Sequence, residues 1–240
     1  KHNDMRDLEK KLQTTAYRKG LIVSDAVFSM DGDTVDLPRL TALGKQYHVL
    51  TMIDEAHATG VIGATGKGTV EYYNYACAPD IIMGTLSKAL GAEGGFACAS
   101  KVIIEYLKNK ARSFIFATSQ APATLAAALK ALEILEAEPR HAQRLQHNVE
   151  YFLRCLHEAG VEADSPTAIV PIVIGDEAAA LKVADELLQQ GCLIPAIRYP
   201  TVAKGTARLR AALMSTHTEE ELKRTAQLIA AAMKKYGGKQ

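Results

Sequence analysis

The chain lacks an excess of charge of either sign. Its 28 basic and 27 acidic residues leave a formal net charge of +1, and the basic residues form no cluster. A protein that binds mainly nucleic acid or an anionic membrane surface carries a basic patch or stripe. The composition therefore argues against both kinds of partner.

Cysteine is scarce and scattered. Cys77, Cys98, Cys155 and Cys192 form no C-x-x-C pair, and their spacing is not that of a metal site. We expect free thiols, no bound metal and a reducing compartment, which indicates the cytoplasm. The sequence also has no apolar run of membrane-spanning length, no charged leader followed by an apolar stretch, no internal repeat and no low-complexity tract. With 48% apolar and 23% charged residues over 240 positions, we expect a soluble globular protein.

Short apolar runs alternate with helical patterns over the first 120 residues. Five runs are candidate strands: 21–28, 49–53, one that opens at Asp80, 95–100 and 113–118. Asp4 and Asp36 are candidate N-caps of the helices before the first and second strands. The first strand, the next helix and the second strand fit within about 30 residues, which is the length of a βαβ unit. The pattern predicts an α/β fold with a mostly parallel sheet.

The second half of the chain begins with a long helix. Pro122 lies in its first turn, and its sequence is apolar nearly all round, so we expect it to be buried. A second helix follows and ends at Gly160. We place the domain change there, with a large domain at 1–158 and a small α+β domain at 159–240. Its expected strands and helices are 169–174, 176–190, 192–197, 207–213 and a helix that begins at Thr218.

Polar side chains follow three of the candidate strands. They are Ser29, Asp54, His57, Thr85, Ser87 and Lys88. The carboxyl ends of parallel strands share one edge of a sheet, where ligands bind. A lysine amine for an aldehyde, a carboxylate for a pyridine nitrogen and hydroxyls for a phosphate together suit pyridoxal phosphate. The residues alone leave open that Asp and His at strand ends are ordinary hydrogen-bonded loop anchors.

A nucleotide-binding alternative fails on spacing. The letters D-E-A-H at 54–57 match the acidic box of some ATPases, and a Gly-rich loop follows. The phosphate loop of such enzymes needs G-x-x-x-x-G-K-[ST]. Lys67 follows Gly66, but Val61 stands where the first glycine belongs, and Gly68 replaces the Ser or Thr.

Four segments together resemble the α-oxoamine synthases. They are 28–33, 54–60, 85–88 and 196–210, and they occur along the whole chain in the family's order. These are fold-type I pyridoxal-phosphate enzymes that condense an amino acid with an acyl thioester and release carbon dioxide. The resemblance therefore implies a transferase with the fold-type I large domain, incomplete here, and a small C-terminal domain.

The resemblance implies a role for individual residues. Lys88 would form the Schiff base with the cofactor, and Asp54 would pair with its pyridinium nitrogen. His57 would hydrogen-bond its phenolic oxygen, with Ser29 close by. Thr85 would contact the phosphate.

Two further residues complete the implied substrate and dimer contacts. Thr118 would reach the phosphate of the neighbouring subunit of a homodimer, and Arg210 would bind the substrate carboxylate. Arg198 and Arg208 are open between substrate contacts and surface partners, and we expect Arg208 to be a surface residue. For Ser29 and Thr118, a plain turn or cap role is an equal alternative.

The segment 196–202 is most similar to the member that joins L-alanine to a pimeloyl thioester, carried on coenzyme A or a carrier protein, in biotin synthesis. Tyr199 departs from that member's pattern, so those that make 5-aminolevulinate or join glycine to acetyl-CoA are alternatives. Family members also carry an N-terminal part with a phosphate loop and a stacking ring, usually histidine, and none of the seven histidines here matches it. We expect an incomplete site. The alternative of another class is a non-catalytic partner subunit, against which the presence of Lys88 argues.

Overall fold

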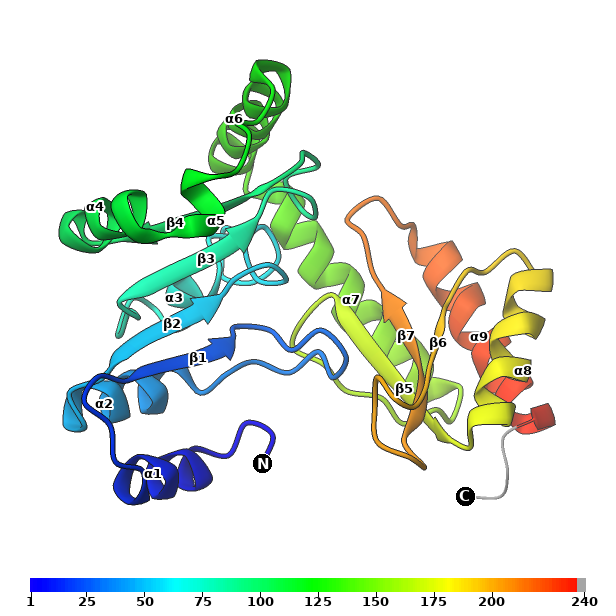
Figure 1. Cartoon of the computed structure of the whole chain (residues 1–240). Helices are drawn as coiled ribbons and strands as arrows, with labels where there is room; N and C mark the ends of the chain where they lie inside the picture. Colours follow the sequence, from blue (N-terminus) through cyan, green and yellow to red (C-terminus); the bar gives the residue numbers. More distant parts are fainter. Residues whose placement is uncertain (237–240) are drawn as a thin grey trace. The chain divides into compact units, whose positions relative to one another are not determined.

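The computed structural model describes residues 1–236, and Figure 1 shows its helices and strands. The chain divides into two compact units. We call them the N-terminal unit, formed by 1–27 and 34–142, and the C-terminal unit, formed by 28–33 and the residues from 143 onward. The expected division at 158/159 differs from this one, because most of the helix that precedes it clusters with the C-terminal unit.

A four-stranded sheet is the centre of the N-terminal unit. Its strands are β1 (Leu21–Asp25), β2 (Leu50–Asp54), β3 (Ile81–Thr85) and β4 (Gly95–Ala99), in that spatial order. β1, β2 and β3 run parallel, and β4 pairs antiparallel with β3. The expected α/β class with a mostly parallel sheet is confirmed.

Helices precede, connect and follow these strands along the chain. They are α1 (Met5–Thr14), α2 (Leu37–Gln46), α3 (Thr69–Tyr72), α4 (Lys101–Lys110), α5 (Arg112–Ile115) and α6 (Pro122–Ala137). The Asp4 carboxylate accepts hydrogen bonds from two backbone amides of the first turn of α1, and Asp36 does the same once for α2. Both N-cap predictions are confirmed.

The two faces of the sheet differ in cover. Helix α2 packs so closely on β2 that a Cβ added to Gly44 would lie 2.4 Å from the Thr51 methyl carbon. On that side Leu40, Leu43 and Ile53 are fully buried. The opposite face carries Leu21, Val23 and Leu50, which are exposed although they alternate as core residues would.

Two expectations for the later part of this unit are wrong. The run 113–118 is not a strand: it begins in the single-turn helix α5, and Phe116 is 73% exposed. Helix α6 is not buried, since Ala128 is its one buried residue and Leu129 is 60% exposed. An apolar composition shows that a segment could be buried, but it does not show what would cover it. Among the described residues, no helix or strand covers either segment.

The C-terminal unit pairs an antiparallel sheet with three helices. Its elements are α7 (Arg140–Glu158), β5 (Ile169–Gly175), α8 (Glu177–Gln189), β6 (Ala196–Ile197), β7 (Ala207–Ala212) and α9 (Glu219–Tyr236). The strand order is β5-β7-β6, and both pairs are antiparallel. The core holds Phe152, Leu156, Ile172, Leu187, Leu209 and Ile229, all fully buried.

A capping box begins α9. The Thr218 amide donates to the Glu221 carboxylate at 2.9 Å, and the Glu221 amide donates to the Thr218 hydroxyl at 3.3 Å. Each bond satisfies a backbone donor that has no partner inside the helix, so the helix begins where the sequence predicts.

The described residues contain no helix with the length and apolarity needed to cross a membrane. All four cysteines are free thiols, as expected from their spacing.

Truncation of Phe152 tests the packing of the C-terminal unit. We expect Phe152→Ala to lower the free energy of unfolding by about 3–5 kcal/mol, because the ring is fully buried and a cavity would remain. Leu193→Ala is the matched control. Leu193 is 81% exposed, and its loss should change stability by no more than about 0.5 kcal/mol. Urea unfolding followed by circular dichroism compares the two, and equal midpoints would contradict the packing described.

Candidate functional site

Asp54 and His57 lie at the carboxyl end of β2. One Asp54 carboxylate oxygen accepts a hydrogen bond of 2.8 Å from the Ala56 amide. This bond shapes the turn that follows the strand, and it leaves the second carboxylate oxygen for a ligand. His57 is half-buried in the same turn.

The hydroxyls of Thr85 and Ser87 lie together after β3, with their oxygens 2.7 Å apart. The Thr85 hydroxyl also donates to the carbonyl of Gly94 at 3.1 Å, and it accepts from the Ser87 amide at 3.2 Å. These bonds fold the chain sharply at the strand end and direct two hydroxyls to one place.

Lys88 follows in this turn and is exposed. Packing holds this turn in place, because Leu86 and Leu90, on either side of Lys88, are buried against Ala128 of α6. An exposed amine on an anchored turn is held in place by its backbone while its nitrogen remains accessible to a ligand.

Asp25 is a residue of this edge that the sequence analysis did not single out. It is the register partner of Asp54 across the parallel pair β1 and β2, so both side chains leave the same face of the sheet. Burial raises the pKa of Asp25 above its ordinary value, the negative charge of Asp54 raises it further, and the positive charge of Lys88 lowers it in part. Asp25, Asp54 and Lys88 therefore interact electrostatically. No local signal in the sequence marked Asp25, because the predicted strand 21–28 runs past it and only the strand register pairs it with Asp54.

Glu55, next to Asp54, has a structural role. Its side chain is buried, and its oxygens accept hydrogen bonds from the Thr69 amide at 2.9 Å and the Thr59 hydroxyl at 3.3 Å. A Cβ added to Gly68 would lie 2.1 Å from Glu55. Burial raises the pKa of Glu55, and the hydrogen bonds partly oppose this. A carboxylate enclosed in this way anchors the Gly-rich loop and is not available for ATPase chemistry, as the failed phosphate-loop spacing predicts.

Ser29 and Arg210 meet in the C-terminal unit. The Arg210 Nε donates a hydrogen bond of 2.5 Å to the Ser29 carbonyl oxygen. Partial burial lowers the pKa of the Arg210 guanidinium below its ordinary value. A guanidinium with little water around it holds an anion more strongly than a fully solvated one does.

The expectation for Arg208 is wrong. It is 9% exposed rather than on the surface, and its Nη1 lies 2.6 Å from the Asp31 carboxylate. Residues two apart on a strand point to the same face, so Arg208 shares a face of β7 with Arg210 instead of lying opposite to it. Both reach the segment 28–33.

The other expected residues lie apart from these groups in the chain. Thr118 is exposed in the connection between α5 and α6, and Arg198 is exposed after β6. Of the seven predicted site residues, five belong to the N-terminal unit, and Ser29 and Arg210 belong to the C-terminal unit.

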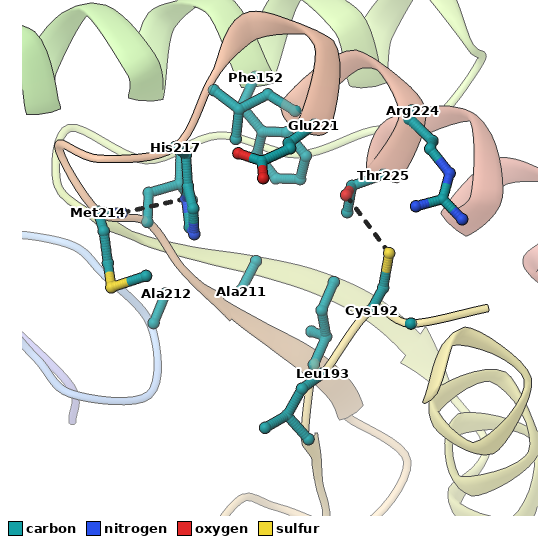
Figure 2. A pocket seen from close by; sticks show the side chains of 14 residues that line it. Phe152, Cys192, Leu193, Ala211, Ala212, Met214, His217, Glu221, Arg224 and Thr225 are labelled. Carbon is teal, nitrogen blue, oxygen red and sulfur yellow. Dashed lines mark hydrogen bonds between the residues drawn. The ribbon is translucent and has the colours of Figure 1, made fainter. Parts of the chain in front are cut away.

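A cavity of about 420 Å³ opens in the C-terminal unit (Figure 2). The loop before β6, the end of β7, the first turns of α9 and Phe152 of α7 line it. None of the seven predicted residues is among its lining residues. Its polar groups are occupied in part: the Cys192 sulfur lies 3.5 Å from the Thr225 hydroxyl, and Glu221 belongs to the capping box. We do not assign the cavity to the site.

The donor set of the N-terminal unit suits pyridoxal phosphate. The edge that β1, β2 and β3 share offers an amine at Lys88, a carboxylate at Asp54, an imidazole at His57 and two adjacent hydroxyls at Thr85 and Ser87. An aldehyde, a ring nitrogen, a phenolic oxygen and a phosphate are the groups that these donors and acceptors match. The described residues fit the cofactor that the sequence resemblance implies.

Comparison with known proteins gives consistent matches. The profile of the family described as aminotransferase class I and II matches residues 1–229. An 8-amino-7-oxononanoate synthase of Bacillus subtilis is 45% identical over 223 residues, which are 92% of this chain and 57% of the relative. One from Lysinibacillus sphaericus is 46% identical over 224 residues, with the same coverage. The chain thus spans less than two thirds of the length of these relatives.

Two solved structures, of an 8-amino-7-oxononanoate synthase and of a serine palmitoyltransferase, match this chain in fold. The 8-amino-7-oxononanoate synthase of Francisella tularensis superposes with a TM-score of 0.81 at 28% identity, over 98% of this chain and 68% of that one. The serine palmitoyltransferase of Sphingomonas wittichii superposes with a TM-score of 0.91 at 28% identity, over 98% and 60%. The sequence resemblance to α-oxoamine synthases and the fold expected from it are confirmed.

Replacement of Asp25 tests the charge arrangement at the strand ends. Because its pKa is raised in the folded chain, the folded state holds this proton more tightly than the unfolded state, so stability is lost as pH rises through the folded-state pKa. Asp25→Asn cannot ionise. We expect its melting temperature to exceed that of the wild type by about 1–2 °C at pH 7.5, with a smaller difference near pH 4.

Asp4→Ala is the control of opposite sign. Hydrogen bonds, first that from the Asp7 amide, lower the pKa of Asp4, so its loss should destabilise the chain more at pH 7.5 than near pH 4. Melting curves at a series of pH values measure both variants. If Asp25→Asn were less stable than the wild type at pH 7.5, the charge arrangement described here would be wrong.

Proposed function

The chain belongs to the aminotransferase class I and II family, and we propose that it forms the cofactor-binding and substrate-binding part of a pyridoxal-phosphate-dependent acyltransferase of the α-oxoamine synthase type. The observation that carries the proposal is the edge where the ends of β1, β2 and β3 place Asp54, His57, Thr85 and Lys88. The sequence resemblance to α-oxoamine synthases implies a role for each of these residues, and the proposal adopts those roles. The reaction joins an amino acid to an acyl thioester with loss of carbon dioxide.

The substrates we propose are L-alanine and a pimeloyl thioester, carried by coenzyme A or by a carrier protein. A new carbon–carbon bond joins the alanine Cα to the pimeloyl carbonyl carbon, the alanine carboxylate leaves as carbon dioxide, and the thiol is released. The product is 8-amino-7-oxononanoate, a precursor of biotin. Relatives named for this activity at 45–46% identity over 92% of the chain support it. Tyr199 keeps glycine C-acetyltransferase and 5-aminolevulinate synthase as alternatives.

Each residue of the N-terminal unit has one task in this proposal. Pyridoxal phosphate, when bound, withdraws electrons from the Cα of the amino acid. Lys88 supplies the amine that holds the cofactor's aldehyde carbon and takes up or returns a proton at Cα. Asp54 keeps the ring nitrogen protonated, which sustains the electron withdrawal. His57 donates a hydrogen bond to the phenolic oxygen, and Thr85 holds the phosphate.

Arg210 is proposed to bind the carboxylate of the amino acid. Its planar guanidinium can grip a carboxylate with two parallel hydrogen bonds, which orients the bond to be broken. Ser29 is proposed to contact the cofactor near its phenolic oxygen.

The assembly we propose is a homodimer with shared sites, in which Thr118 reaches the phosphate held by the other subunit. A cytoplasmic location, expected from the scattered cysteines, remains a prediction. The non-catalytic alternative is disfavoured because a partner subunit would have no chemical use for an amine at Lys88 beside Asp54 and His57.

Lys88→Ala tests the proposed cofactor bond. We expect the wild type to gain a visible absorbance band with pyridoxal phosphate, which borohydride then fixes as a mass increase on Lys88, and the variant to lose both. Lys110→Ala, an exposed lysine of α4, is the matched control and should keep both. The measurement is made on this chain and on a version extended at its N-terminus to the length of its relatives. A variant that retains the full band would disprove the assignment of Lys88.

Arg210→Lys tests recognition of the carboxylate. A lysine keeps the charge but loses the two-pronged hydrogen bond, so we expect the apparent KM for L-alanine to rise by roughly tenfold or more. The KM for pimeloyl-CoA should be unchanged, since its one free carboxylate is at the end of the acyl chain remote from the reacting carbonyl carbon. Release of free thiol, titrated with a chromogenic disulfide, follows the rate. A rise in the KM for the thioester alone would place Arg210 elsewhere in the mechanism.

A further inference from the structure

The segment 28–33, which carries Ser29, has a fixed shape. The Gly32 amide donates to the Phe28 carbonyl at 2.8 Å, and the Phe28 amide donates to the Asp33 carbonyl at 2.9 Å. Gly32 adopts φ +72°, and a Cβ there would lie 2.1 Å from the Ile169 carbonyl oxygen. The segment is therefore a tight turn that lies directly against β5.

Side chains of the C-terminal unit hold this turn from two sides. On one side the Thr167 hydroxyl donates to the Gly32 carbonyl at 2.9 Å, and the Ser165 hydroxyl, 3.3 Å from the same oxygen, donates to the Ile169 carbonyl of β5 at 2.6 Å. On the other side Arg208 of β7 donates from Nη1 to the Asp31 carboxylate at 2.6 Å and to the Met30 carbonyl at 3.3 Å. The ion pair thus ties the middle of the turn to β7.

Arg208 and Arg210 use their donors differently. Arg208 also donates from Nε to the Thr206 carbonyl at 3.1 Å, so this buried guanidinium is bound to three protein oxygens. Arg210 donates only from Nε, to the Ser29 carbonyl. Among the residues that the structure describes, none accepts a hydrogen bond from its two terminal nitrogens. The terminal edge of Arg210 is the one that can take a carboxylate end-on.

The orientation of that edge depends on the turn. A guanidinium is planar, so a hydrogen bond from Nε to a fixed carbonyl sets the direction in which Nη1 and Nη2 point. The Ser29 carbonyl is fixed as far as the turn is fixed. Among the described side chains that hold the turn, apart from Arg210 itself, Arg208 bonds nearest to Ser29 along the chain, at Met30 and Asp31. Without this contact the Arg210 side chain would gain rotational freedom, which a bound carboxylate must remove.

We infer that Arg208 and Asp31 are positioning residues: their ion pair holds the turn 28–33 so that the Ser29 carbonyl orients Arg210 toward the carboxylate of the substrate amino acid. This inference rests on the proposed function for the identity of the ligand of Arg210. The geometry of the turn, the ion pair and the Nε hydrogen bond does not depend on that function.

The first arm of the test measures substrate recognition. In Arg208→Lys and in Asp31→Asn we expect the KM for L-alanine to rise by roughly three- to tenfold, with kcat and the KM for pimeloyl-CoA nearly unchanged. Asp31→Glu can still form the ion pair with Arg208, so its KM for L-alanine should be close to that of the wild type. Arg39→Lys is the matched control, because Arg39 forms an ion pair of similar length, 2.7 Å, with Glu9 on the surface of the N-terminal unit.

Coupling to Arg210 separates positioning from a general structural effect. If Arg208 acts through Arg210, the double variant Arg208→Lys/Arg210→Lys should have the same KM for L-alanine as Arg210→Lys alone. If the double variant instead raises the KM for L-alanine by the product of the two single-variant factors, Arg208 acts independently of Arg210 and the inference is overturned.

The second arm needs no activity. Hydrogen exchange of the Arg210 Nε–H, followed by NMR in a chain with labelled arginine, should be slow in the wild type and in Arg39→Lys. It should be at least several-fold faster in Arg208→Lys and Asp31→Asn. Unchanged exchange in both variants would overturn the inference whatever the enzyme does. If exchange accelerates but no form of the chain responds to pyridoxal phosphate and L-alanine, the proposed function fails while the positioning of Arg210 by the turn stands.

Discussion

The parallel pairing of β2 with β1 on one side and β3 on the other is the constraint on which the N-terminal unit depends. The ladder continues one residue beyond the strands, since the Ala26 amide donates to the Asp54 carbonyl at 2.9 Å and the Glu55 amide donates to the Met83 carbonyl at 2.7 Å. These bonds fix where each turn begins. A slip of one residue would turn Asp54 to the opposite face and separate it from Asp25, so the register is also what assembles the charges.

Alternation along β2 gives two adjacent acids opposite roles. Asp54 leaves the strand toward the open edge, whereas Glu55, one residue later, is enclosed under the Gly-rich loop and bonded to Thr59 and Thr69. A carboxylate enclosed in this way needs such partners, because an unpaired buried charge is costly. The loop in turn needs glycine at 68, where φ is +88° and any side chain would meet Glu55. Thus Glu55 holds the framework that supports Asp54, the acid proposed to bind the cofactor.

Local signals in the sequence identified most of the elements but not their surroundings. The N-caps at Asp4 and Asp36 and the capping box at Thr218 depend on residues near in sequence, and the structure has them where they were predicted. The first three strands begin within one residue of their predicted starts, but the first ends at Asp25 instead of residue 28. The errors at 113–118 and in α6 concern what covers an apolar segment, which periodicity does not report. Asp25 was missed because its importance comes from strand register, and no pattern within β1 reveals its neighbour on β2.

Arg208 shows most clearly why side-chain roles need the tertiary structure. In the sequence it is one arginine of a pair two residues apart on β7, of which Arg210 was expected to bind the carboxylate and Arg208 was expected on the surface. Its distinction from Arg210 comes from residues far away in the chain: Asp31 and Met30 occupy the donors of Arg208, while Ser29 takes a single donor of Arg210. One short turn thus decides which guanidinium belongs to the framework and which remains available to a ligand. Arg208 and Arg210 lie on the same face of β7. One guanidinium can therefore be bonded within the protein while the other keeps its terminal nitrogens for a ligand.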